Sequence, residues 1–145
     1  MKIWRDIEKF EGSNPVITIG IFDGVHQGHK HLLRQLKGKA EELNGESVVV
    51  SLWPHPREVI GSETGTLKYL NSLDEKALLL SNEGIDHLII IPFTPEFASL
   101  DSCSFVKEYL VRKKVQPASK KTRRNQHWRK DEMVEMWVLR GKEKV

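Results

Sequence analysis

The sequence has little of what marks a secreted or membrane protein. It contains a single cysteine, Cys103, in 145 residues, which excludes an intrachain disulfide framework and fits a reducing compartment. No stretch approaches the roughly 18 apolar residues that a membrane span requires. Residues 1–8 lack the apolar core of a signal peptide. We therefore expect a cytoplasmic protein with no membrane partner.

Two common phosphate-binding motifs are also missing. The Gly-Lys-Ser/Thr ending of the P-loop does not occur, and neither does the Gly-x-Gly-x-x-Gly dinucleotide pattern. In their place stands a corner rich in glycine and histidine, residues 20–29 (Gly-Ile-Phe-Asp-Gly-Val-His-Gln-Gly-His). The β-branched residues 15–21 before it predict a buried strand. Apolar residues at helical spacing after it predict a helix from Gln27, which Asn44-Gly45 ends.

The spacing within this corner favours anion binding. His26 and His29 are three residues apart, so in a first helical turn they share a face and can both donate hydrogen bonds to a phosphate chain. A helix start also offers free N–H groups and the positive end of the dipole. Glycines at 20, 24 and 28 let the backbone approach a ligand closely.

Strand and helix signals alternate along the rest of the chain. Residues 47–52 and 87–93 predict two more buried strands, and Trp53-Pro54-His55-Pro56 ends the first of them. Ser72 and Glu75 form a capping box for a helix that Glu83-Gly84 closes. A final helix is expected from Asp101 or Ser102, with an apolar side of Phe105, Val106, Tyr109 and Leu110. This order predicts an α/β fold with a parallel sheet, whose ligands bind at the carboxyl ends of the strands.

The histidine corner, the Pro-His-Pro segment and residues 73–106 together resemble a known family over residues 1–112. The family is the FMN adenylyltransferase half of bacterial bifunctional riboflavin kinase/FAD synthetases. The resemblance implies a Rossmann-like nucleotidylyltransferase fold. It also implies transfer of AMP from ATP to FMN with Mg²⁺, which gives FAD and pyrophosphate, and substrates rather than macromolecules as partners.

The resemblance also suggests roles for individual residues. His26 and His29 stabilise the ATP phosphates and the departing pyrophosphate, and no metal ligand is assigned. The nucleotide loop comprises Gly20, Ile21, Phe22, Asp23, Gly24 and Gly28. The segment near flavin and nucleotide comprises Pro54, His55 and Pro56. His55 either contacts a ligand or only turns the chain. For Asp23, orientation of the loop is favoured over an approach to phosphate and magnesium, because a carboxylate repels a triphosphate unless a cation intervenes.

The chain departs from the family pattern after residue 112. The family's Gly-x-Asp-Phe-x-Phe-Gly and Ser-Ser/Thr-x-Ile-Arg segments do not occur in these 145 residues. We expect no riboflavin kinase domain and no kinase activity from them. Residues 113–145 hold 11 of the 23 Lys and Arg residues but 4 of the 20 Asp and Glu, a net charge of +7 against −4 for residues 1–112. We expect this basic tail to be poorly ordered and unrelated to the family. A shifted reading frame or a genuine alternative C-terminus would each produce it.

This departure leaves the fold incomplete and the function open to alternatives. The strand at Val16–Ile21 would lack its family neighbour and form an exposed edge, which residues 133–139 could cover. The chain could be inactive alone, a non-catalytic remnant that binds nucleotide, or another nucleotidylyltransferase. A nucleic-acid-binding role for the basic tail ranks last, because the sequence offers no recognition helix or RNA-binding signature.

Overall fold

Four parallel strands form one sheet in the order β1-β4-β3-β2. They are β1 (Lys2–Trp4), β2 (Val16–Gly20), β3 (Ser47–Trp53) and β4 (His87–Pro92). The structure is a computed structural model that describes residues 1–60, 70–105 and 109. The parallel α/β architecture and the strands at β2, β3 and β4 confirm the prediction from sequence. Strand β1 was not predicted.

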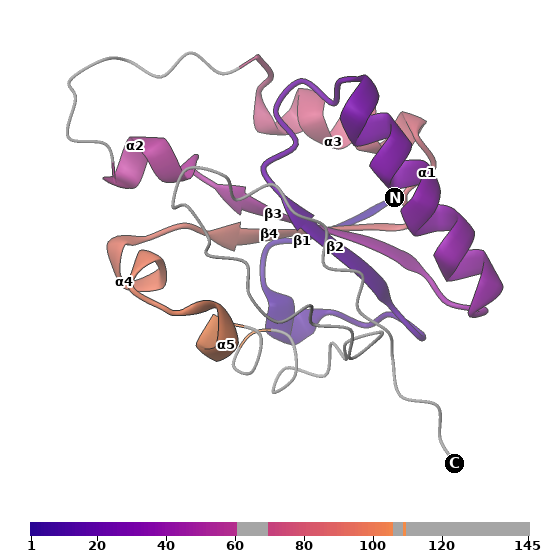
Figure 1. Ribbon diagram of the computed structural model, residues 1–145, viewed down its shortest axis with the longest axis horizontal. Helices are drawn as coiled ribbons and strands as arrows, with labels where there is room; N and C mark the ends of the chain where they lie inside the picture. The colour runs from indigo at the N-terminus through magenta and orange to yellow at the C-terminus, as the bar shows by residue number, and fades with distance from the viewer. Residues whose placement is uncertain (61–69, 106–108, 110–145) are drawn as a thin grey trace, which may run out of the picture.

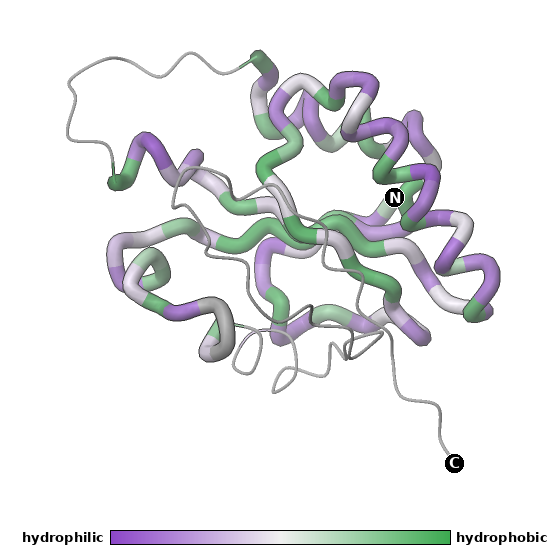
Figure 2. The backbone as a smooth tube through the Cα atoms, viewed as in Figure 1, coloured by the Kyte–Doolittle hydropathy of each residue, from purple (hydrophilic) through white to green (hydrophobic). Residues whose placement is uncertain are grey.

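The sheet is buried on both faces, which explains why its strands read as continuous apolar runs. Alternate residues point to opposite sides, so Ile17, Val48 and Ile89 pack in one core cluster while Val49 and Leu88 pack in the other. The tube in Figure 2 shows the hydrophobic strands at the centre of the molecule.

Helices cover the two faces unequally (Figure 1). The long helix α1 (Gln27–Glu42) and α3 (Leu73–Asn82) pack on one face. The opposite face is covered by the 3-10 helix η1 (Ile7–Lys9), α4 (Pro95–Ala98) and α5 (Ser102–Phe105). A one-turn helix, α2 (Pro56–Ile60), follows β3.

The helix ends follow the signals in the sequence. Ser72 and Glu75 form the predicted capping box, with each side chain accepting from the other residue's backbone N–H. Helix α1 ends before Asn44, which takes a left-handed φ of 48°, and Gly84 after α3 has a φ of 76°. Asp101 accepts a hydrogen bond from the Ser104 N–H and so begins α5.

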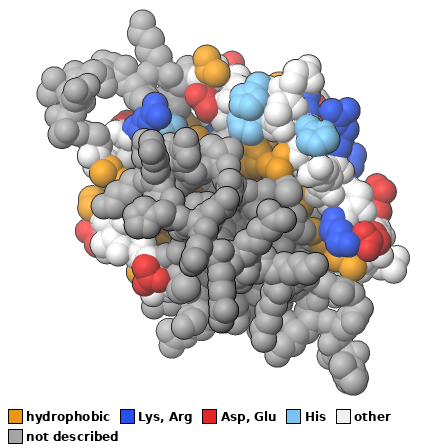
Figure 3. All heavy atoms as spheres, viewed as in Figure 1, with side chains coloured by type: hydrophobic (Ala, Val, Ile, Leu, Met, Phe, Trp, Pro, Cys, Tyr) orange, Lys and Arg blue, Asp and Glu red, His pale blue; other side chains and the backbone are white. Residues whose placement is uncertain are grey.

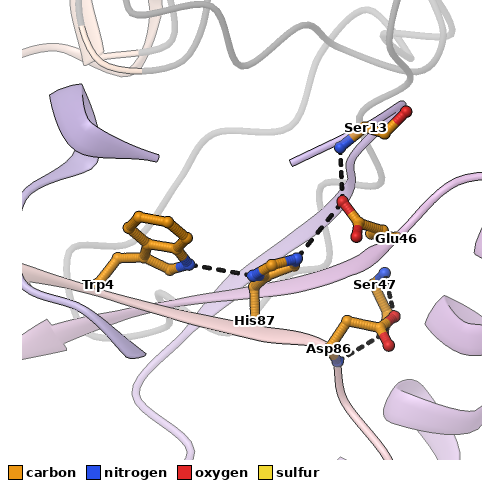
Figure 4. Close-up of polar contacts among 6 residues, drawn as sticks. All are labelled: Trp4, Ser13, Glu46, Ser47, Asp86 and His87. Atoms are coloured by element: carbon orange, nitrogen blue, oxygen red, sulfur yellow. Dashed lines mark hydrogen bonds and ion pairs between the residues drawn. The ribbon is translucent and has the colours of Figure 1, made fainter. Parts of the chain in front are cut away.

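A side-chain hydrogen bond that no sequence pattern predicts joins strand β1 to the sheet (Figure 4). The Trp4 indole donates to Nδ1 of the buried His87 at 3.0 Å. On the other side of that ring, Nε2 lies 3.4 Å from the Glu46 carboxylate, which also accepts from the Ser13 backbone N–H. Because Nδ1 accepts, the neutral imidazole carries its proton on Nε2, facing Glu46.

A second contact fixes the amino ends of β3 and β4. The Asp86 carboxylate accepts from the Ser47 N–H at 2.8 Å and from its hydroxyl at 2.6 Å. Both contacts lie at the amino ends of β3 and β4, whereas the histidine corner follows the carboxyl end of the parallel strand β2. They therefore organise the fold rather than the candidate site.

Strand β2 ends the sheet order and pairs with β3 alone among the strands the structure describes. Whether residues 133–139 cover this edge is a prediction that lies outside the described residues. The same holds for the polar loop 61–66, for Val106 and Leu110, and for the basic tail 113–145. Within the described chain, no helix has the length and apolar character to cross a membrane.

Candidate functional site

The histidine corner and the Pro-His-Pro segment follow β2 and β3, which are neighbours in the sheet. Because these strands are parallel, their carboxyl ends meet at one edge, where ligands of such sheets bind. Histidine side chains are visible along the upper edge of the face in Figure 3. The fold therefore brings together the two segments that the sequence singled out.

The loop between β2 and α1 has an uncommon backbone. Phe22, Gly24 and Val25 have φ values of 51°, 77° and 39°, so two of its three left-handed residues carry side chains. Those two side chains are 1% and 3% exposed and pack in the core cluster beneath α1. Burial therefore holds the loop in a conformation that exposed residues of these types would avoid.

His26 and His29 form a stacked pair at the start of α1. Their ring centroids are 3.8 Å apart with planes inclined by 22°, so the shared face expected from their spacing is present. His26 is the exposed N-cap residue, whereas His29 is 8% exposed and packs 5.1 Å from the Phe22 ring. Within the described chain, Nδ1 of His29 is buried without a hydrogen-bond partner.

The protonation of His29 follows from this position. Burial lowers the pKa of His29 below its ordinary value of 6.5, and neighbouring His26 lowers it further, while Asp23 partly opposes both. The ring is therefore neutral at neutral pH. It can accept a proton or donate a hydrogen bond as charge develops on a ligand.

The start of α1 is open to an anion. His26 makes no side-chain cap hydrogen bond, and the first turn contains no acidic residue. The first backbone N–H groups of a helix have no partner within it, and the helix dipole places positive charge there. An anion is the natural partner for such a terminus when two imidazoles stand beside it.

The structure gives all three glycines of the corner an immediate neighbour within the protein, and for Gly24 this is the Leu70 side chain, 2.8 Å from an added Cβ. A Cβ at Gly20 would lie 2.8 Å from the Phe22 ring, and one at Gly28 would lie 3.2 Å from the His26 ring. The absence of side chains at these positions thus makes room for the two aromatic rings. Gly24 differs, because its φ of 77° itself favours glycine.

Asp23 faces the segment before α3. Its carboxylate accepts from the Leu70 backbone N–H, with one oxygen at 3.1 Å and the other at 3.4 Å. This contact ties the loop to the segment before α3, and the role of Asp23 in orienting the loop stays a prediction. Among the described residues, no group of three or more His, Cys, Asp or Glu side chains is placed to hold a metal ion.

The Pro-His-Pro segment begins α2. Nδ1 of His55 accepts from the Arg57 backbone N–H at 3.1 Å, and Pro56 is the first helical residue. Burial and then Arg57 lower the pKa of His55, while Asp23 raises it. Asp23 also raises the pKa of His29, so its carboxylate acts on a histidine of each segment.

Sequence reasoning missed Lys76, a residue of α3 that is 1% exposed. Its ammonium group donates to the Ile21 carbonyl at 2.6 Å, directly before the left-handed turn at Phe22. A signal was present in the sequence. Lys76 falls on the apolar stripe of α3 formed by Leu73, Ala77 and Leu80, where a lysine is out of place.

The parallel sheet and the histidine corner at a helix start together define a Rossmann-like nucleotidylyltransferase domain. The FAD synthetase family model matches residues 9–118, which is most of the chain. The chain belongs to the FAD synthetase family.

Curated relatives agree on this family. The chain is 35% identical over 108 residues to the bifunctional riboflavin kinase/FMN adenylyltransferase of Listeria monocytogenes, covering 74% of this chain and 32% of that protein. It is 38% identical over 96 residues to the protein of the same name from Pseudomonas fluorescens, covering 66% and 30%. The chain thus spans about a third of the length of these relatives.

A solved structure shares the fold. The crystal structure of a macrolide-efflux protein from Streptococcus pneumoniae superposes with a TM-score of 0.65 at 22% identity, covering 79% of this chain and 38% of that one. At this identity the likeness concerns the fold alone.

Proposed function

We propose that this chain is an FMN adenylyltransferase domain, which transfers AMP from ATP to the phosphate of FMN and releases pyrophosphate. The observation that carries the proposal is the stacked pair His26 and His29 at the uncapped start of α1. Membership of the FAD synthetase family and the names of the relatives supply the substrates. We place the reaction in the cytoplasm, as the single cysteine suggests.

The chemistry requires positioning and charge stabilisation more than a protein nucleophile. An FMN phosphate oxygen attacks the α-phosphorus of ATP, and the bond to the bridging oxygen breaks as pyrophosphate leaves. The imidazoles and the free N–H groups at the start of α1 then stabilise, by hydrogen bonding, the negative charge that develops on the pyrophosphate. In this proposal the neutral His29 donates to a phosphate oxygen from inside the site, and His26 covers it from the solvent side.

Magnesium enters this proposal as part of the substrate. The Asp23 carboxylate is hydrogen-bonded to Leu70, and the described residues provide no cluster of metal ligands. In this proposal Mg²⁺ arrives complexed with ATP and neutralises part of its charge. The Pro54-His55-Pro56 segment, at the end of the neighbouring strand, is the proposed flank for flavin or nucleotide.

The test is FAD formation by the purified chain from ATP, Mg²⁺ and FMN, followed by chromatography. His29→Ala should lower turnover about 10²-fold to 10³-fold, the effect of removing one preorganised donor at a developing charge, with little change in FMN affinity. His31→Ala is the matched control, because this exposed histidine lies on the same helix and contacts Gln35 instead. A parallel loss of FMN affinity and turnover in the His29 variant would contradict the role given to this residue.

If no FAD forms, calorimetric measurement of ATP binding on the same sample distinguishes the alternative functions. Binding of ATP without turnover would identify a non-catalytic nucleotide-binding domain, the alternative that the missing family segments favour. Turnover with a different acceptor in competition assays would identify another nucleotidylyltransferase. Absence of ATP binding would refute both.

A further inference from the structure

Lys76 is a buried cation close to the proposed nucleotide site. Its Nζ donates to the Ile21 carbonyl at 2.6 Å, lies 3.4 Å from the Ser51 hydroxyl and sits 5.4 Å from the centre of the Trp53 ring. Within the described part of the chain, no carboxylate forms an ion pair with it. A buried ammonium without a counter-ion is costly, so its position requires a reason.

One consequence of this position is mechanical. The Ile21 carbonyl accepts a second hydrogen bond, from the Ser51 hydroxyl at 3.2 Å. Lys76 of α3 and Ser51 of β3 therefore hold one carbonyl from two elements, at the point where the chain leaves β2. The next residue, Phe22, begins the left-handed turn that carries the chain to His26. The ammonium thus fixes the start of the loop.

The other consequence is electrostatic. Burial is the main cause of the lowered pKa of both His29 and His55, and the positive charge of Lys76 makes a smaller contribution in the same direction at each. Burial lowers the pKa of Lys76 itself, and the Asp23 carboxylate only partly offsets this. Asp23 is therefore the acidic group that acts most on this ammonium, and it forms no ion pair with it.

We propose that Lys76 is a positioning residue of the nucleotide site, a buried ammonium that fixes the turn out of β2 and supplies positive charge that the ligand's phosphates neutralise. The inference rests on the proposed function, because it requires a polyphosphate at the histidine corner. It adds a specific consequence. Removing the charge should weaken binding in proportion to the number of phosphates, whereas a purely structural defect should weaken all ligands alike.

The experiment measures binding of ATP, ADP, AMP and adenosine to the full chain by calorimetry. In Lys76→Met the dissociation constant of ATP should rise about tenfold or more, as expected for the loss of a charged partner, with smaller increases for ADP and AMP and less than about twofold for adenosine. Lys37→Met is the matched control, because its ammonium also donates to a backbone carbonyl, that of Glu83, at 3.1 Å. That variant should bind all four ligands like the wild type.

Ser51→Ala separates the mechanical from the electrostatic contribution. It removes the neutral donor to the same carbonyl and leaves the charge in place. We expect a small decrease in affinity that does not depend on the number of phosphates. A loss graded by phosphate number in this variant, or an ungraded loss in Lys76→Met, would overturn the inference.

A measurement on the wild type covers the case in which Lys76→Met does not fold. In protein labelled with ¹³C at lysine Cε, saturation with ATP should shift the Lys76 resonance and leave that of Lys37 unchanged. An unmoved Lys76 resonance in ATP-saturated protein would overturn the inference alone. Failure of the wild type to bind ATP would overturn the proposed function, and with it the site that Lys76 positions.

Discussion

Replacement of Gly20 by alanine tests whether the packing of Phe22 builds the histidine corner. The added methyl would lie 2.8 Å from a ring carbon of Phe22, which is 1% exposed and packs in the core cluster beneath α1. Overpacking of this kind costs about 1–3 kcal/mol, and replacing a glycine within a strand returns about 0.5–1 kcal/mol. We therefore expect the free energy of unfolding to fall by about 1–2 kcal/mol.

The same substitution at Gly38 provides the control. This glycine lies in the exposed interior of α1, and nothing is within 4 Å of the added methyl. Gly38→Ala should therefore raise the free energy of unfolding by about 0.5–1 kcal/mol and leave ATP binding unchanged. Gly20→Ala should also weaken ATP binding, because the displaced ring packs against His29.

Urea unfolding of both variants measures the two effects, and a third variant tests the cause. Phe22→Leu introduced with Gly20→Ala removes the ring that the methyl meets, so the two changes should be less destabilising together than the sum of their separate effects. A Gly20→Ala protein as stable as the wild type, or additive effects in the double variant, would refute the conclusion that the Phe22 ring shapes this corner.

Four further predictions concern the fold and its pH dependence. Ser72→Ala should cost about 1 kcal/mol in urea unfolding through loss of the capping box. Trp4→Phe should also cost about 1 kcal/mol, because it leaves Nδ1 of the buried His87 without its donor; a neutral effect in the same assay would show that β1 contributes little. Leu33→Ala should cost about 2–5 kcal/mol, since this side chain of α1 is fully buried in the core cluster between the helix and the sheet. Because the pKa of His29 is lowered in the folded state, the unfolded state binds more protons, and the free energy of unfolding should fall as the pH drops below about 6.5. His29→Asn should flatten this pH dependence, which urea unfolding midpoints measured from pH 8 to 5 would show.

The elements that the sequence predicted correctly share one property: each has an apolar pattern long enough to identify it as a helix or a strand. Helix α1 shows an apolar stripe over four turns, and β3 is a run of buried residues ended by Pro54. Strand β1 has three residues, too few to show a pattern. It forms because its backbone pairs with β4 and because Trp4 finds a partner in His87, 83 positions away. A long-range contact of this kind leaves no local trace.

In the candidate site, too, the sequence predicts the features that depend on local spacing but not those that depend on distant residues. The spacing of His26 and His29 predicts that they share a face, and the stacked rings have that arrangement. The spacing does not determine which of the two is buried, because this depends on Phe22, whose left-handed backbone places its ring beside His29. For Asp23 the charge argument predicts orientation of the loop, and the structure shows that its carboxylate accepts hydrogen bonds from the Leu70 N–H. The partner itself was not predictable, since it stands 47 positions away in the sequence.

The arrangement of the corner implies that folding and ligand binding depend on the same residues. Backbone strain at Phe22 and Val25 costs about 1–3 kcal/mol each, and burying an apolar side chain of this size contributes about 1.5–3 kcal/mol. The two contributions are of similar size, so the loop keeps its shape only while both side chains remain in the core. The exposed His26 is held at the end of that loop and makes no cap contact of its own. Changes to the buried residues of the corner should therefore lower stability and nucleotide affinity together, whereas changes to His26 should lower affinity alone.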